Sequence, residues 1–289
     1  MAQLTLVLER KLTTAVERMP AFPKSVQVIL EMTRDINCLP RNLVGVIEKD
    51  PVMTIKILRV INSAYYGLPN KITSVGQSVV YLGINTIKNL ALSFAAVGIL
   101  PRFNTTGFDI QRYLLHSLSV ASIARLLCEK FSRADADPGD CYIAGLLHDF
   151  GKVVFAQFMV GEFMKALAIT VDRNIPLYEA EIEVIGADHA FVGALLAKKW
   201  KFAEPLVNCI RDHHAFDAEP SAMLDCLRMA DAICRKHAFG DSGNPWRDEE
   251  LPLLPFRFGD DIEVIISELG DLAKIVNDAQ VFAQIGTER

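Results

Sequence analysis

The chain has 289 residues, and 51% of them are apolar, which is enough to build one large packed domain or two modest ones. Its 30 basic and 35 acidic residues give a formal net charge of -5. The absence of a general basic field disfavours nucleic acid as the principal partner. The first 20 residues lack the basic and apolar segments of a secretory signal, and the six cysteines form no C-x-x-C pair. A cytoplasmic location in a reducing compartment is therefore expected.

Helical periodicity runs from end to end, and no segment alternates like a strand, so the sequence predicts an all-α fold. Helix starts are expected at Asp50-Pro51 and at Ser74. The first of these helices is expected to bury one apolar stripe, made of Val52, Ile55, Leu58 and Ile61. The longest apolar run, residues 90–100, is about half of the roughly 20 residues that a membrane span needs. It predicts a buried core helix and no membrane association.

Polar and turn-forming segments mark the boundaries. The segment PRFNTTG (101–107) follows the long apolar helix and predicts two parts, residues 1–106 and 107–289. It is too short to be a flexible tether, so the two parts are expected to pack together and to unfold in one transition. Residues 240–260 carry prolines and glycines and predict a surface excursion. One closing helix is expected to follow, with apolar positions Ile262, Ile265, Leu269, Leu272 and Val276.

Histidines and aspartates are concentrated in the second half of the chain. Their imidazole nitrogens and carboxylate oxygens are ligands that divalent iron, manganese, zinc or nickel accept. Burying them without compensation would cost several kcal/mol, which a shared cation offsets. One or two such ions are therefore predicted, and a hydrogen-bonded polar core without metal is the alternative. The predicted ligands are His116, His148, Asp149, His189, His213, His214 and Asp231.

Local patterns indicate how these side chains converge. His116 lies on an apolar helical face, so its ring is expected to point inward. His189 is placed in the first turn of a helix, and the His213-His214 doublet at the end of another, with diverging rings. Cys141 is expected to be a core thiol rather than a ligand. In AGLLHDFGKVVF, one continuous helical face is expected to carry Gly145, His148, Asp149 and Lys152.

Several motifs resemble the HDOD domain, the HD-related output domain of bacterial signalling proteins. The most diagnostic are EKDPVMTIKILRVINSAYYG and YLGINTIKNLAL, followed in order by AGLLHDFGK, DHAFVGALLAKKW and IRDHHAF. The resemblance covers about residues 19 to 235. It implies an N-terminal helical subdomain packed on an HD-like helical core, and a regulatory or output role. Many members lack part of the HD metal set, whereas this chain retains all seven predicted ligands.

Two functions remain open at this stage. The favoured one is a signalling output protein with a protein partner, and with a phosphate-containing small ligand as a further option. Residues 62–67 (NSAYYG) either supply a partner surface or only cap a helix over packed tyrosines. Whether the chain is an enzyme is left uncertain, leaning towards no.

The alternative function is a metal-dependent phosphohydrolase acting on a nucleotide or phosphomonoester. In that case Lys152 would be catalytic by stabilising negative charge, and His189, His213 and His214 would bind a second metal or the phosphate. The first cation would be held by His116, His148, Asp149 and Asp231. Hydrolysis of cyclic-di-GMP is disfavoured, because the chain continues as HHAFDAEPSAML without the signature of HD-GYP phosphodiesterases and has Arg112 where they tend to offer a carboxylate.

Overall fold

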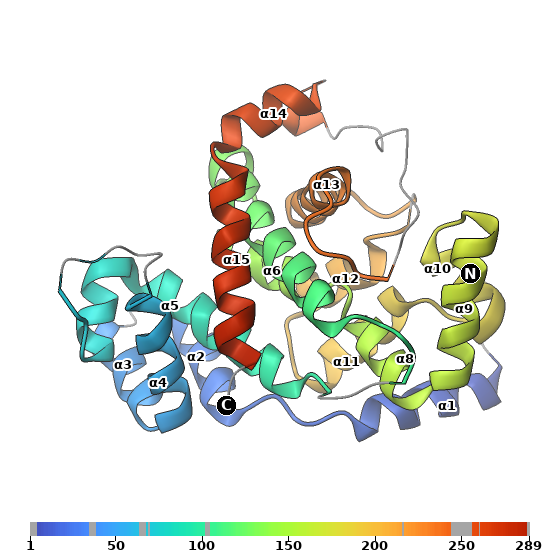
Figure 1. Ribbon diagram of the computed structural model, residues 1–289, viewed down its shortest axis with the longest axis horizontal. Coiled ribbons are helices and arrows are strands. Elements are labelled where there is room, and N and C mark those ends of the chain that lie inside the picture. Colours follow the sequence, from blue (N-terminus) through green and yellow to red (C-terminus); the bar gives the residue numbers. More distant parts are fainter. Residues whose placement is uncertain are drawn as a thin grey trace. The chain divides into compact units, whose positions relative to one another are not determined.

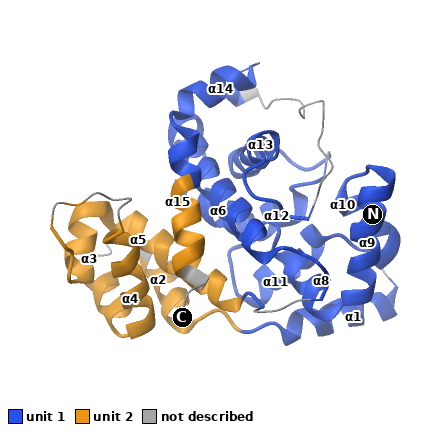
Figure 2. Cartoon of the chain, viewed as in Figure 1, with its two compact units in different colours: residues 1–20, 100–276 blue, residues 21–99, 277–289 orange. Residues whose placement is uncertain are grey.

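The computed structural model describes residues 5–34, 39–63, 68, 70–101, 105–215, 217–243, 256–259 and 261–287 (Figure 1). Within these ranges the chain is helical and contains no strand, which confirms the all-α prediction. The chain forms two compact units (Figure 2). Unit 1 comprises residues 1–20 and 100–276, and unit 2 comprises residues 21–99 and 277–289.

Both units are discontinuous in sequence, in contrast to the two contiguous parts expected from the segment after residue 100. The physical reason lies at the end of helix α1 (Leu6–Arg18). The Lys199 ammonium donates to the carbonyls of Glu17 and Met19, each at 2.7 Å, and the Trp200 indole donates to that of Pro20 at 3.0 Å. These bonds tie the N-terminal helix to a segment about 180 residues further along the chain. A single unfolding transition stays a prediction.

Unit 2 contains α2 (Lys24–Arg34), α3 (Pro40–Glu48), α4 (Pro51–Ile61), α5 (Val75–Ile99) and the end of α15 (Leu272–Thr287). The start of α4 is as predicted, because the Asp50 carboxylate accepts from the Met53 amide at 3.1 Å and Pro51 takes the first helical position. Ser74 likewise caps α5 by accepting from the Gln77 amide at 3.2 Å. Residues 64–67 of the NSAYYG segment lie outside the described residues.

The predicted apolar stripe of α4 is wrong. Val52 is 65% exposed and Ile55 is 59% exposed. Strict three-residue steps fall short of the 3.6 residues of one turn, so such a row drifts around the helix. The buried face follows mixed spacing instead, with Met53, Ile57, Val60 and Ile61.

The core helix predicted over residues 90–100 is the second part of α5. Gly83, with φ 78° and ψ 160°, interrupts the helical geometry, and most residues after Ile87 are buried. Among the described residues, α5 is the one helix long and apolar enough to meet the length and hydropathy of a membrane span. Of its most apolar window, 67% is buried inside the protein.

Unit 1 holds the remaining helices. They are α1, α6 (Ile110–Leu127), the π-helix η1 (Cys128–Ser132), α7 (Pro138–Leu147), α8 (Phe150–Phe158), α9 (Val160–Arg173), α10 (Leu177–Ile185), α11 (His189–Lys199), α12 (Glu204–Asp212), α13 (Ala222–Lys236), the 3-10 turn η2 (Phe256–Phe258), α14 (Ile262–Leu269) and the first residues of α15. Helices α6, α7 and α13 pack against one another, and α11 packs against α8 and α12. These two groups of helices carry the polar cluster described below.

The single closing helix predicted near the C-terminus is two helices. Gly270 has φ 87° and ψ -147°, which ends α14, and the Asp271 carboxylate then accepts from the Lys274 amide at 3.1 Å at the start of α15. The apolar spacing continues across this break, so periodicity alone does not reveal it. Of the predicted excursion over 240–260, residues 244–255 and 260 lie outside the described residues.

Candidate metal centre

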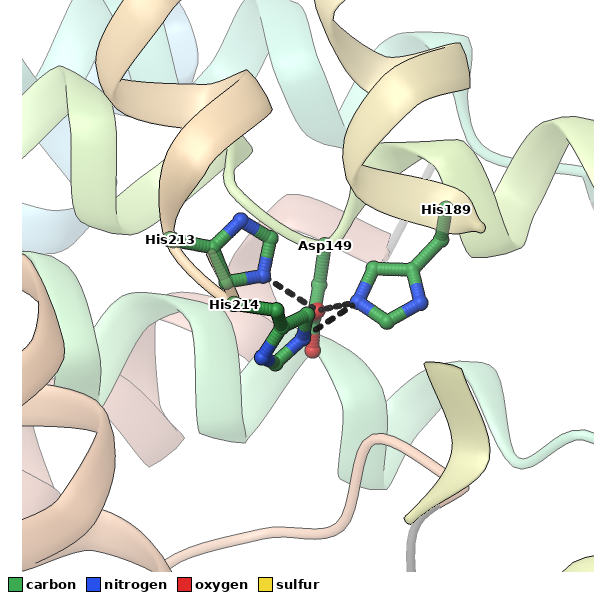
Figure 3. A group of neighbouring side chains, drawn as sticks. All are labelled: Asp149, His189, His213 and His214. Atoms are coloured by element: carbon green, nitrogen blue, oxygen red, sulfur yellow. Dashed lines mark hydrogen bonds and ion pairs between the residues drawn. The ribbon is translucent and has the colours of Figure 1, made fainter. Parts of the chain in front are cut away.

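The structure brings all seven predicted ligands into one buried cluster in unit 1. Helix α6 contributes His116, the turn between α7 and α8 contributes His148 and Asp149, and α11 contributes His189 in its first turn, as predicted. The turn after α12 and helix α13 supply the rest, His213, His214 and Asp231. Figure 3 shows the Asp149 carboxylate between the rings of His189, His213 and His214.

The seven residues form two groups whose possible ligand atoms lie within 4.8 Å of one another. One group contains Asp149, His189, His213 and His214, and the other contains His116, His148 and Asp231. Asp149 is placed between the groups. Its Oδ1 lies 3.0 Å from His189 Nε2, and its Oδ2 lies 3.3 Å from His148 Nε2. The geometry therefore has room for one or two ions that share this carboxylate.

Two of the rings are held in place by the backbone. His148 Nδ1 lies 2.8 Å from the Gly145 carbonyl, and His213 Nδ1 lies 2.7 Å from the Ile210 carbonyl. A carbonyl only accepts, so each Nδ1 carries a proton, and in the neutral form of the ring Nε2 directs a lone pair at the cluster. This is the tautomer in which a histidine binds a metal.

A third orienting group, Glu181 of α10, is not among the residues predicted from the sequence. This carboxylate is fully buried; Oε2 lies 2.5 Å from His189 Nδ1 and accepts from the His189 amide at 2.8 Å. Burial alone would lower the pKa of His189, but the charge of Glu181 and the hydrogen bond to Asp149 raise it to about 9. A signal was present, because Glu181 interrupts an apolar row formed by Leu177 and Ile185 at four-residue spacing.

Two carboxylates and two imidazole rings of the cluster are in the protonation states that bind a cation. Burial favours the neutral form of Asp149, yet the charges of His148 and Lys152 hold its pKa well below the usual range. Burial likewise opposes ionisation of Asp231, but Arg235 and His116 keep its pKa well below the usual range. Both carboxylates are thus anionic. Burial and neighbouring histidines hold the pKa values of His213 and His214 well below normal, so their rings are neutral.

Buried ring nitrogens without hydrogen bonds test whether the cluster fits a metal ion. His116 Nε2 and His213 Nε2 are buried and make no hydrogen bond of normal geometry, although His116 Nε2 lies 3.2 Å from Asp231 Oδ1. The Nε2 atoms of His189 and His214 lie 3.0 Å apart. Ligands bonded to one ion at 2.0–2.2 Å are spaced by about 3.0–3.5 Å. The donor types and their spacing therefore fit a divalent metal.

Some local expectations need correction. His148 and Asp149 form a turn between α7 and α8, so they do not continue one helical face with Lys152. The turn lets both side chains reach the cluster from a helix end. The rings of His213 and His214 do not diverge, because their centroids lie 3.9 Å apart and both belong to the Asp149 group.

The structure also places three further residues named from the sequence. Gly145 permits close approach of α6, because a Cβ there would lie 2.6 Å from Ala121 Cα. The Lys152 ammonium does reach the pocket, where it donates to Asp149 Oδ2 at 2.7 Å and to the Ser242 hydroxyl at 3.1 Å. Arg112 is outside the cluster, since its half-exposed guanidinium faces Asp241 at 3.5 Å.

Known proteins resemble this chain in structure and in sequence. A solved structure of an HDOD domain protein with unknown function from Geobacter sulfurreducens has a TM-score of 0.79 at 26% identity, with 97% of both chains covered. A Treponema pallidum protein, named only as uncharacterized, is 26% identical over 255 residues, or 87% of this chain. Ribonuclease Y of Clostridium kluyveri is 29% identical over 180 residues, or 62% of this chain.

The chain spans 48% of the Treponema relative and 28% of the ribonuclease, so each is a longer protein of which this chain matches a part. A family model for the HDOD domain matches residues 19–216, which is more than half of the chain. This match begins near the start of unit 2 and ends just after the His213-His214 doublet. The chain belongs to the HDOD domain family.

Proposed function

We propose that the protein is a regulatory output module of bacterial signal transduction whose HD-like core binds one or two divalent transition metals. The observation that carries the proposal is the complete ligand set, of which every member except half-buried His214 is buried. The ligands from α6, α11 and the α7–α8 turn are all at most 2% exposed, namely His116, His148, Asp149 and His189. A site filled by protein ligands suits a structural or regulatory metal, whereas a catalytic metal keeps an open position.

The position of Lys152 supports the same conclusion. Its side chain is 3% exposed, and its ammonium is already engaged by Asp149 and Ser242. To stabilise charge on a phosphate it would have to leave a buried carboxylate, and the broken pair would cost about 3–5 kcal/mol. In this proposal Lys152 balances the charge of the ligand set, and the output is delivered to a protein partner.

The second candidate is a metal-dependent phosphohydrolase with a nucleotide or phosphomonoester substrate. It is favoured by the ligand arrangement, because two groups that share Asp149 resemble a site for two ions. It is also favoured by the likeness to ribonuclease Y, a relative named for action on a phosphodiester. A bound metal would polarise a phosphoryl oxygen and activate water. Half-buried His214, whose ring stacks on Tyr178 at 4.5 Å, would form the entrance.

A turnover assay separates the two candidates. Wild type, His148→Ala and Asp149→Ala are compared on cyclic-di-GMP, nucleotides and phosphomonoesters, with manganese or iron supplied. His237→Ala is the matched control, because His237 is exposed at the end of α13 and away from the cluster. We expect no turnover of cyclic-di-GMP and little or none of the other substrates. Robust turnover that His148→Ala and Asp149→Ala abolish, and that His237→Ala retains, would establish the enzyme instead.

Metal content is tested on the same variants. Protein purified without added metal is analysed by inductively coupled plasma mass spectrometry. Wild type and His237→Ala are expected to retain a divalent transition metal, and Asp149→Ala to lose most of it, since its carboxylate lies between the two ligand groups. Equal metal content in wild type and Asp149→Ala would remove Asp149 from the proposed ligands.

A further inference from the structure

A second group of possible metal ligands lies in unit 1, and it consists of cysteines alone. The Sγ atoms of Cys128, Cys141 and Cys226 all lie within 4.8 Å of one another, and all three residues are fully buried. Thiolates that share one Zn²⁺ at about 2.3 Å are spaced by about 4 Å. Small side-chain rotations would therefore bring all three sulfurs to a single ion.

This cysteine group is separate from the His/Asp cluster although it uses the same helices. Cys141 lies seven residues before His148, which is about 10 Å along the helix at 1.5 Å per residue. Cys226 precedes Asp231 on α13, and Cys128 lies at the far end of α6 from His116. The three helices thus carry nitrogen and oxygen ligands at one level and sulfur ligands at another.

The backbone at Cys128 is unusual. Cys128 begins the π-helix η1, a wide turn that is uncommon and is often found at functional sites. Ser132 ends this turn; its hydroxyl is buried and makes no hydrogen bond of normal geometry with the described residues. The hydroxyl borders Cys226, where it favours the thiolate. The turn thus brings the Cys128 thiol and the Ser132 hydroxyl to the same group.

Fixed positive charge adjoins the cysteines. The Arg257 guanidinium is held by Asp225 at 2.7 Å and by Asp135 at 3.3 Å. A hydrogen bond with the Cys141 thiol lowers the pKa of Cys226 against the effect of burial, and Ser132 and Arg257 act in the same direction. Burial raises the pKa of Cys128 to about 11.

Cys234, on the same helix as Cys226, is a buried thiol outside the cysteine group and serves for comparison. Cys234 lies two turns beyond Cys226 on α13 and is equally buried, but it belongs to no group of possible ligands among the described residues. Burial keeps its pKa well above normal. Packing alone thus accounts for Cys234, whereas Cys128, Cys141 and Cys226 also lie together as possible ligands of one ion.

We propose that Cys128, Cys141 and Cys226 form a buried thiolate site for a soft divalent cation of the Zn²⁺ or Cd²⁺ class. Binding forms three metal–sulfur bonds, and the three thiols release their protons to solvent. The resulting complex carries one net negative charge, and it lies beside the ion pairs that Arg257 makes with Asp225 and Asp135.

The experiment titrates the full-length protein with Cd²⁺ and records thiolate-to-metal charge-transfer absorption in the ultraviolet, to which histidine and carboxylate ligands do not contribute. Cadmium is added both to native protein and during refolding, because the site is buried. We expect one Cd²⁺ per chain to develop the band, while Cd²⁺ held by the His/Asp cluster adds no absorption of this kind. It should be largely lost in Cys226→Ala and in Cys141→Ala and retained in Cys234→Ala, with circular dichroism reporting the folding of each variant.

Absence of the band from wild type under both conditions would overturn the proposal, whatever the variants do. A band that persists at full intensity in a folded Cys226→Ala protein would overturn it as well, because the sulfur ligands would then lie elsewhere. Neither result depends on the His/Asp cluster. The outcome is therefore independent of the function proposed above.

Discussion

The two compact units bury different kinds of side chain. Unit 1 buries ionised groups that compensate one another, such as Asp149, Lys152 and Glu181. The described part of unit 2 buries one charged side chain, Lys88, and is otherwise packed mainly by apolar residues. Desolvated charges are stable only with their partners, whereas apolar packing is lost in proportion to the atoms removed. The two units should therefore respond differently to substitutions of similar size.

The largest loss of stability is expected at Gly151, where the backbone of α8 packs against the backbone at His189. An alanine Cβ at Gly151 would lie 2.0 Å from the His189 carbonyl oxygen, and backbone atoms cannot give way cheaply. Gly151→Ala should cost more than about 4 kcal/mol of unfolding free energy, or prevent folding. Gly161→Ala in α9 meets nothing within 4 Å and should be close to neutral. An unchanged urea midpoint for Gly151→Ala would contradict the close packing of α8 on α11.

The second-largest loss of stability is expected when the Asp149 carboxylate is removed. Asp149→Ala leaves the Lys152 ammonium buried without its partner, so unfolding free energy should fall by about 3–5 kcal/mol even in metal-free protein. Chelation before urea denaturation isolates this loss from the loss of metal. Asp172→Ala, an exposed aspartate on α9, is the control and should change stability by less than about 0.5 kcal/mol. Equal stability of the two variants would mean that Asp149 is not needed to compensate Lys152.

Two isoleucines on α4 test the apolar packing of unit 2. Ile57 is fully buried and Ile55 is 59% exposed, so they form a matched pair two residues apart. Ile57→Ala should cost about 2–5 kcal/mol, and Ile55→Ala should stay within about 0.5 kcal/mol of wild type. Thermal denaturation of both proteins gives the comparison. Similar losses of stability in the two variants would mean that Ile55 is buried as the three-residue stripe predicted.

The smallest effect concerns the exposed ion pair between Lys11 and Glu162 in unit 1. Lys11→Met should cost only about 0–1 kcal/mol, because solvent and salt screen the pair. The hydrogen bond from Lys11 lowers the pKa of Glu162. Its contribution is therefore present above the unfolded-state pKa of about 4.3 and is lost as pH falls through the lower folded-state value. The difference between wild type and variant should shrink in acid, and a difference that grows in acid would reverse this sign.

The grouping of the seven candidate ligands was predictable, because histidines and aspartates in otherwise apolar, buried segments need one another's charges or hydrogen bonds. Asp50 and Ser74 were predictable because capping chemistry is local. Two other features were not. The break at Gly270 leaves the apolar spacing intact, and Glu181 is recognised as a partner of His189 only when α10 and α11 are placed together.

The docking of α1 has a consequence for the order of folding. Lys199 and Trp200, which hold the end of α1, are synthesised about 180 residues after it. In unit 2, Phe94 stacks on Phe282 of the last helix, with ring centroids 4.4 Å apart. Such distant contacts slow folding, because the intervening chain must be ordered before they form. Each unit can therefore be completed only after its distant segment has been synthesised. Residues 21–99 of unit 2 are available to pack together before α11, the partner of α1, has been made.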